Sequence, residues 1–151
     1  MRLQSKTKVC FERKSIIPDA VFRFDVPGWH DWLFAVEVKN GFDTKATFAQ
    51  ICRHIDAIGS EAIEKAFSFP KRPVRVLFVF SEYWRGMERR SAESPMREVM
   101  KRLAESRDLT DYYPFFAFST LERLRCDFLR EWFYVRKNGT IEQAQNSIFD
   151  A

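Results

Sequence analysis

Two apolar runs decide the fold of this chain: Ile-Ile-Pro-Asp-Ala-Val-Phe-Arg-Phe at residues 16–24 and Leu-Phe-Ala-Val-Glu-Val-Lys-Asn-Gly at residues 33–41. The sequence between them, Val-Pro-Gly-Trp-His-Asp at residues 26–31, is typical of a turn. We therefore predict a hairpin of two antiparallel strands over residues 16–24 and 32–39. Pro18 lacks an amide hydrogen, which suits the start of the first strand.

Charged side chains interrupt both strands of the predicted hairpin. Because side chains alternate along a strand, Val36 and Val38 face one side of the sheet while Glu37 and Lys39 face the other. Asp19 opens the first strand, and in an antiparallel pair its carboxylate can reach the same edge as Glu37. The sequence thus predicts a small acidic site with one lysine. The alternative is a solvated strand face with an incidental ion pair.

The chain after the hairpin predicts alternating helices and strands. An apolar stripe at steps of three and four predicts a helix capped by Asp43 or Thr44 and ended by Gly59. Residues 74–80 are apolar apart from Arg75, the pattern of a central strand covered on both faces. The other expected segments are a polar lead-in over 1–8, a strand over 9–12, a short helix over 61–67, a break at the prolines of 70–73, an exposed loop over 81–94, a helix from Pro95 capped by Ser94, a strand over 115–118, a helix from Ser119 or Thr120, and a strand over 132–135.

Length and composition predict one folded domain. The chain has 151 residues, of which 46% are hydrophobic and 30% are charged, enough to bury a core without disulfides or a structural metal. The α/β pattern predicts a mixed β-sheet flanked by helices, with a core over about residues 9–125. The three cysteines, Cys10, Cys52 and Cys126, lack the spacing of a zinc site or a secreted scaffold, which favours a cytoplasmic protein. No apolar run is long enough to span a membrane, and no signal peptide is expected.

The predicted acidic site has the chemistry of a magnesium centre. The carboxylates of Asp19 and Glu37, with the backbone carbonyl of Val38, are hard oxygen ligands that suit Mg²⁺, or Mn²⁺ in its place. Such an ion can bind a phosphodiester and activate a water that attacks phosphorus. Lys39 beside it could orient or deprotonate that water and stabilise the developing charge.

This arrangement resembles the PD-(D/E)XK nuclease superfamily. Its pattern of Pro-Asp, a hairpin, Glu-x-Lys and a following helix is matched by Pro18-Asp19, Glu37-Val38-Lys39 and the helix from about Thr44. The resemblance implies a restriction-endonuclease-like fold, with Asp19 and Glu37 as metal ligands and Lys39 as the catalytic lysine. In many members that helix carries a glutamine and, four positions on, an aromatic or basic residue, and Gln50 with His54 is similar to that element.

Within the superfamily, the order of Pro-Asp-Ala, Glu-Val, the strand over 74–80 and Phe-Phe-Ala-Phe-Ser-Thr-Leu-Glu at residues 115–122 is most similar to the nuclease-like region of replication-relaxation proteins of plasmids and other mobile elements. An enzyme of this size that cuts both strands of DNA is expected to act as a homodimer. A DNA-recognition domain could lie on a separate partner chain.

Basic side chains outside the acidic site are candidates for binding nucleic acid, which a net charge of +4 mildly favours. Guanidinium groups hold phosphates and aromatic rings stack on bases, so Tyr-Trp-Arg at residues 83–85 fits such a surface as well as a solvated loop. The candidate residues are Arg53, His54, Arg85, Arg89 and Arg90.

The sequence therefore leads to a Mg²⁺-dependent endonuclease that hydrolyses phosphodiester bonds in DNA. Its candidate catalytic residues are Asp19, Glu37, Lys39 and Gln50, and its metal ligands are Asp19, Glu37 and Val38. One alternative is a non-catalytic DNA-binding accessory or regulatory protein of a mobile element. Another is a protein whose aromatic surface binds a second protein.

Overall fold

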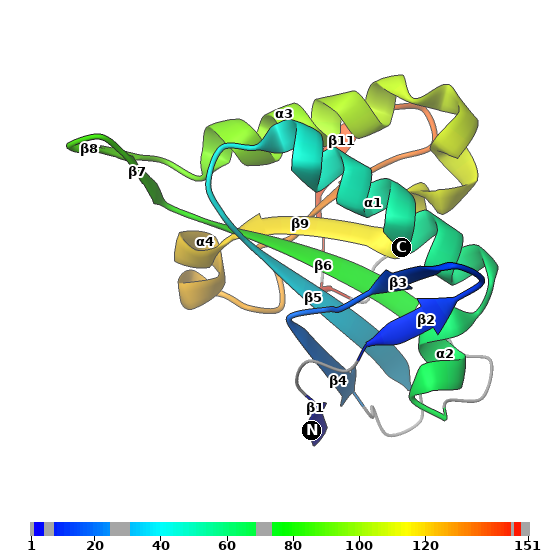
Figure 1. Cartoon of the computed structure of the whole chain (residues 1–151). Coiled ribbons are helices and arrows are strands. Elements are labelled where there is room, and N and C mark those ends of the chain that lie inside the picture. The colour runs from blue at the N-terminus through cyan, green and yellow to red at the C-terminus, as the bar shows by residue number, and fades with distance from the viewer. Residues whose placement is uncertain (1, 5–7, 25–30, 69–73, 146, 149–151) are drawn as a thin grey trace.

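The computed structural model describes residues 2–4, 8–24, 31–68, 74–145 and 147–148 as a single α/β domain (Figure 1). Seven strands form one mixed sheet, in the order β1-β4-β5-β6-β9-β10-β11. Their bounds are β1 Arg2–Gln4, β4 Ala20–Phe24, β5 Trp32–Asn40, β6 Val74–Ser81, β9 Phe116–Thr120, β10 Phe133–Val135 and β11 Ile141–Gln143. Two separate pairs stand beside this sheet: β2 (Val9–Phe11) with β3 (Lys14–Ile16), and β7 (Tyr83–Arg85) with β8 (Glu88–Arg90).

The predicted hairpin is present, because β4 and β5 are antiparallel neighbours from Ala20 opposite Val36 to Phe24 opposite Trp32. On its other side β5 runs parallel to β6, and β6 runs parallel to β9. The carboxyl ends of three parallel strands therefore meet at one edge of the sheet. In parallel sheets this edge is where ligands usually bind.

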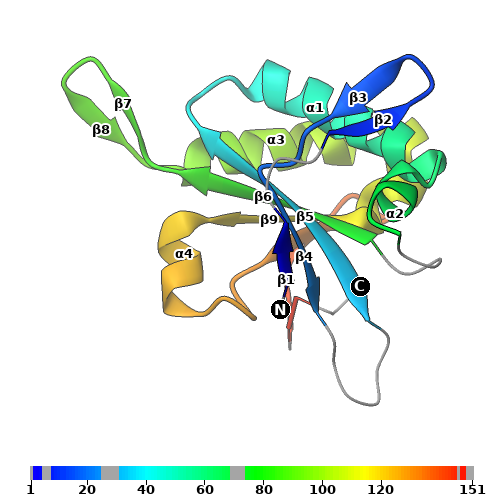
Figure 2. The ribbon, with the colours of Figure 1, turned by 60° about the horizontal axis from the view of Figure 1, so that its bottom comes forward.

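Two long helices, α1 (Thr44–Gly59) and α3 (Glu93–Glu105), lie together on one face of the sheet (Figure 2). Their apolar stripes pack on β-strand side chains to form the larger core, whose fully buried members include Ile51, Phe78, Phe80, Met96, Val99, Met100, Leu103, Phe116 and Phe118. A smaller cluster covers the opposite face and includes Phe34, Leu77, Trp132, Tyr134 and Ile148. The core thus extends to Ile148, and the predicted limit near residue 125 was too short. The remaining helices are α2 (Ala62–Ala66), the 3₁₀ helix η1 (Arg107–Phe115) and α4 (Leu121–Cys126).

Helix α1 has the bounds that its sequence predicts. The Asp43 side chain accepts a hydrogen bond from the Ala46 amide at 2.8 Å, which satisfies one of the free amides of the first turn. Gly59 is its last residue. Because β5 ends only four residues before α1 begins, the helix is held directly over the carboxyl end of that strand.

Strand β6 is central and buried, as predicted, and its one charged residue is accommodated by aromatic rings. Arg75 is 1% exposed, and its guanidinium lies 4.7 Å from the ring centre of Trp32 and 5.0 Å from that of Tyr134. Its Nη1 also donates to the Tyr134 hydroxyl at 3.1 Å and to the Ile148 carbonyl. Cation–π contacts and these hydrogen bonds replace the water that the guanidinium loses on burial.

Two predictions at the amino-terminal end were wrong. The strand expected over 16–24 is broken, because Ile16 ends β3 while β4 starts only at Ala20. Pro18 lies in the break, where its missing amide hydrogen costs no ladder bond. The expected lead-in over 1–8 contains β1, which pairs with β4.

The segment over 81–94 was also predicted wrongly. It is not a loop, because β7 and β8 form a hairpin that projects from the domain (Figure 1). Gly86 has a φ of 64° at the two-residue turn, where a positive φ is required. Helix α3 begins at Glu93 rather than Pro95, and the Ser91 hydroxyl, not that of Ser94, accepts from the Glu93 amide at 3.2 Å.

The carboxyl-terminal elements follow the sequence more closely. Thr120 caps α4 by accepting from the Arg123 amide, as one of the two expected caps. Strand β9 covers Phe116–Thr120, slightly later than expected, because Phe115 still belongs to η1. Strand β11 was not predicted. The turn expected over 26–31 and the break expected over 70–73 fall mainly or wholly outside the described residues.

Candidate functional site

The candidate site lies where the end of β5 meets α1. Glu37 and Lys39 point together toward the helix, as strand alternation predicts, and Gln50 and His54 face them from α1, one turn apart. The side chain of Glu37 is only 2% exposed and that of Lys39 is 17% exposed. Glu37 is therefore not part of a solvated strand face.

Hydrogen bonds join these four side chains into one network. The Nε2 atom of His54 lies 2.8 Å from Oε1 of Glu37, and the Nζ atom of Lys39 lies 3.3 Å from Oε2. Lys39 also donates to the side-chain oxygen of Gln50. We assign the proton of His54 to Nε2 because its partner is a carboxylate. Both oxygens of Glu37 thus have partners within the protein.

This network makes the burial of Glu37 tolerable. A buried carboxylate is costly unless charge and hydrogen-bond donors replace its water, and here a lysine and an imidazole do so. Lys39 is held in turn by Gln50 and by the ring of Phe78, whose centre lies 5.7 Å from Nζ. The other ring nitrogen of His54, Nδ1, is buried without a hydrogen-bond partner among the described residues.

Asp19 directly precedes the first residue of β4 and lies beside the backbone of β5. Its amide donates to the Val36 carbonyl at 2.9 Å, and its Oδ2 accepts from the Val38 amide at 2.8 Å. Among the described residues, Oδ1 of Asp19 has no hydrogen-bond partner, and the residue is exposed. The amide and carbonyl of a strand residue point to the same side, so the carbonyl of Val38 faces Asp19 as well.

The donors at this edge fit a hard divalent cation by their chemistry. Asp19 offers a free oxygen, Val38 offers a carbonyl beside it, and each oxygen of Glu37 retains a second lone pair. Mg²⁺ and Mn²⁺ favour such ligands and keep several waters. In the part of the chain that the structure describes, no three His, Cys, Asp or Glu side chains form a metal-binding group. A cation here would therefore depend on the backbone carbonyl and on water.

His54 and Arg53 occupy different environments. His54 is fully buried against Glu37, so the prediction that it contacts nucleic acid was wrong, and its contacts make it a support for the carboxylate. Arg53, the preceding residue of α1, is exposed. The structure brings together Glu37, Lys39 and Gln50 by direct hydrogen bonds, whereas Asp19 joins them through the backbone of β5.

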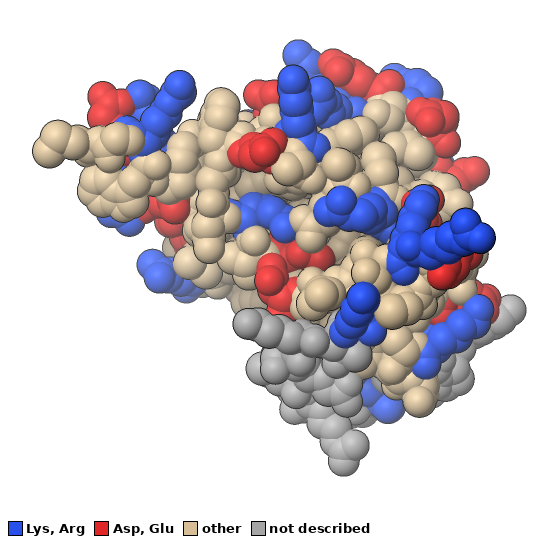
Figure 3. Space-filling view, in the orientation of Figure 1, with Lys and Arg blue, Asp and Glu red and all other residues tan. Residues whose placement is uncertain are grey.

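The other predicted basic residues lie on the β7–β8 hairpin. Arg89 forms an ion pair with Glu82, and Arg90 forms one with Glu88, while the Arg85 guanidinium lies 5.9 Å from the ring centre of Phe42. Figure 3 shows basic and acidic side chains interleaved on this face of the molecule rather than a continuous basic band. A polyanion would therefore be attracted by individual basic side chains that lack an acidic partner, and not by a continuous basic surface.

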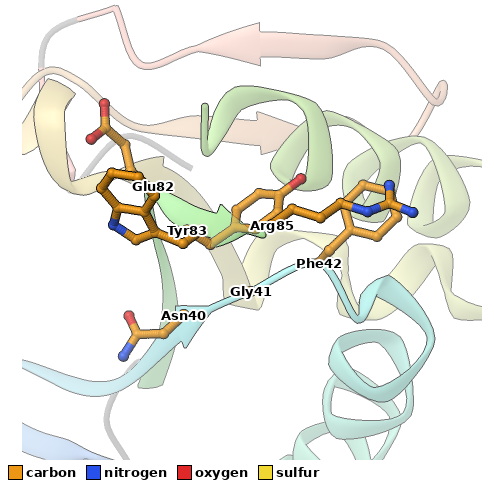
Figure 4. A pocket seen from close by; sticks show the side chains of 7 residues that line it. Asn40, Gly41, Phe42, Glu82, Tyr83 and Arg85 are labelled. Atoms are coloured by element: carbon orange, nitrogen blue, oxygen red, sulfur yellow. The ribbon is translucent and has the colours of Figure 1, made fainter. Parts of the chain in front are cut away.

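A hollow of about 560 Å³ lies between this hairpin and the end of β5 (Figure 4). Its lining residues are Asn40, Gly41, Phe42, Glu82, Tyr83, Trp84 and Arg85. Sequence reasoning missed Asn40 and Phe42 as parts of a surface hollow. The available signal was their place directly after the Glu-x-Lys strand, because side chains that follow a parallel strand gather at its carboxyl edge.

No protein-family model matches the chain, and no match was found among curated proteins or solved structures. A function for the chain is therefore inferred from the geometry of the site and the chemistry of its residues. Within the described residues, no helix is both long and apolar enough to cross a membrane.

Proposed function

We propose that this chain is a Mg²⁺-dependent endonuclease of the PD-(D/E)XK type, which hydrolyses phosphodiester bonds in DNA. The observation that carries the proposal is the lysine joined to a buried glutamate on β5 and to a glutamine on α1, at the strand edge beside Asp19. A solvated ion pair needs neither burial nor partners from a second element, whereas a reacting group needs both for a fixed position.

The residues would divide the work as follows. Asp19, Glu37 and the Val38 carbonyl would hold the cation, which when bound would offset charge on the phosphate and favour ionisation of water. Lys39 keeps part of its surface open, so its ammonium can donate to the attacking water or to a phosphate oxygen. Gln50 positions Lys39, and His54 positions Glu37.

The strand order supports the proposal at the level of the fold. An antiparallel pair carries Asp19 and Glu37, the helix after it supplies Gln50, and the chain returns to a parallel neighbour of β5. The PD-(D/E)XK pattern suggested in the sequence needs this order of hairpin, helix and strand. A restriction-endonuclease-like architecture is therefore the fold we propose.

Cleavage of supercoiled plasmid in the presence of Mg²⁺ or Mn²⁺ tests the proposal. We expect Asp19→Asn and Lys39→Met each to lower the rate by at least about 100-fold, because each removes a ligand or a charge-stabilising group. Lys45→Met, which removes an exposed lysine from the first turn of α1, serves as the control and is expected to cleave normally. Thermal unfolding of each variant separates lost chemistry from lost structure. Full activity in both site variants would refute the assignment.

One observation favours a second candidate, a DNA-binding accessory protein of a mobile element without catalysis. Both oxygens of Glu37 already have protein partners, so the network is complete without a cation. This candidate predicts a gel shift of DNA that is independent of metal and is not followed by cleavage. Failure to bind any nucleic acid at low salt would instead favour a protein that binds another protein.

A further inference from the structure

The hollow at the carboxyl edge of the sheet combines aromatic surface with one available positive charge. It opens between the β7–β8 hairpin and residues 40–42, which directly follow Lys39 (Figure 4). The rings of Phe42 and Tyr83 lie 5.9 Å apart between centres. The hollow is therefore lined by residues that come directly after the candidate site in the chain.

Large aromatic rings remain in contact with solvent there. Trp84 is 70% exposed and Phe42 is 50% exposed, although contact of such large apolar rings with water costs free energy. Exposed aromatic rings gathered beside a hollow are typical of a binding surface, in contrast to single exposed apolar residues. Their flat faces suit a flat ligand.

The charges on the hairpin single out Arg85. Arg89 and Arg90 are each neutralised by a glutamate, Glu82 and Glu88 respectively. Arg85 has no carboxylate partner among the described residues, and its guanidinium lies over the ring of Phe42. A guanidinium held on an aromatic ring keeps its N–H donors free for an anion.

We propose that this hollow binds single-stranded DNA, with an unpaired base stacked on Trp84 or Phe42 and a phosphate held by Arg85. Ring faces stack on bases only where the base is not already stacked inside a duplex, which favours a single strand. The inference rests on the proposed function and specifies its substrate: a strand bound here leads along residues 40–42 to Lys39. The enzyme would then act on single-stranded or locally opened DNA.

Fluorescence anisotropy with a fluorescein-labelled single strand of about 16 nucleotides tests the inference on the metal-free full chain. The variants are Trp84→Ala, Phe42→Ala and Arg85→Ala. Met87→Ala is the control for an exposed apolar residue, because Met87 is 97% exposed at the hairpin tip and outside the hollow. Arg130→Ala, which removes an exposed arginine that does not line the hollow, is the control for charge.

We expect Trp84→Ala and Arg85→Ala to weaken binding by about 5- to 100-fold, and both controls to bind as the wild type does. A probe with the same phosphates but abasic sugars should lose a similar factor, and a matched duplex should bind more weakly than the single strand. Equal binding by the variants and the wild type, equal binding of the abasic probe, or no binding at low salt would overturn the inference.

The two proposals fail separately. Cleavage by the wild type, with single-strand binding unaffected by the variants, would refute the binding site and leave the nuclease. Binding that depends on Trp84 and Arg85, without cleavage in the presence of any divalent metal, would refute the nuclease and leave the binding site.

Discussion

At the scale of single residues, the contact between His54 and Glu37 gives a measurable prediction. His54→Ala removes a hydrogen-bond donor from a buried carboxylate and leaves a cavity under α1. We expect the free energy of unfolding to fall by about 2–4 kcal/mol, measured by urea denaturation. His54→Gln keeps a donor and should lose less. A loss below about 0.5 kcal/mol in His54→Ala would show that the contact contributes nothing to stability.

Sequence alone predicted which residues share this site but not how deeply they lie. Alternation along β5 places Glu37 and Lys39 on one face, and helical spacing places Gln50 with His54. Burial depends on how closely α1 packs on that face, which is a tertiary property absent from local patterns. For the same reason His54 was expected at the surface, and its role as a partner of Glu37 was missed.

At the scale of elements, helix α2 contains a carboxyl group in an unfavourable place. Burial raises the pKa of Glu64 above its ordinary value of 4.5, and its Oε2 is buried without a hydrogen-bond partner among the described residues. The native state therefore holds this proton more tightly than the unfolded chain does. As pH rises from 4.5 through the raised pKa, the free energy of unfolding must therefore fall. Below pH 4.5 the carboxyl group is protonated in both states, and its burial no longer makes stability depend on pH.

Glu64→Gln should remove this pH-dependent penalty. We expect the variant to gain stability relative to the wild type as pH rises from about 4 to about 7, and to match it more closely in acid. Urea denaturation across this range measures the difference, with Glu105→Gln on the exposed side of α3 as the control. A difference in the free energy of unfolding that stays constant with pH would show that the Glu64 carboxyl group carries no such penalty.

The elements predicted correctly were those whose sequence carries clear capping residues and a clear apolar pattern. Helix α1 has a capping aspartate and a complete apolar stripe, and both its ends were correct. Helix α3 offered two serines near its start, and the spacing did not reveal that Ser91 rather than Ser94 makes the bond. The β7–β8 hairpin has no buried face, so it lacks the alternation that identifies a strand, and only Gly86 signalled its turn.

At the scale of the whole molecule, a bound cation should stabilise the folded chain. A ligand that binds only the native state raises its stability, by about 2.7 kcal/mol at roughly 100 times its Kd. For a domain of this size we expect the thermal midpoint to rise by about 5–10 °C with Mg²⁺ or Mn²⁺.

Asp19→Asn should abolish this rise while preserving an acceptor for the Val38 amide. The matched control is Asp111→Asn, because the side chain of Asp111 is 91% exposed and far along the chain from the site. Sodium chloride at equal ionic strength separates specific binding from screening. An equal rise in both variants would place the cation elsewhere.

The buried pair of Glu37 and His54 also bears on what has shaped this sequence. Replacing a buried polar pair by apolar residues of similar volume often leaves stability unchanged or raises it, by about 1–4 kcal/mol. Selection for folding alone would therefore be expected to fill positions 37 and 54 with residues such as leucine or methionine. We infer that the glutamate and histidine facing each other inside the domain serve the proposed activity as well as the fold, and that positions 37 and 54 are where this requirement acts.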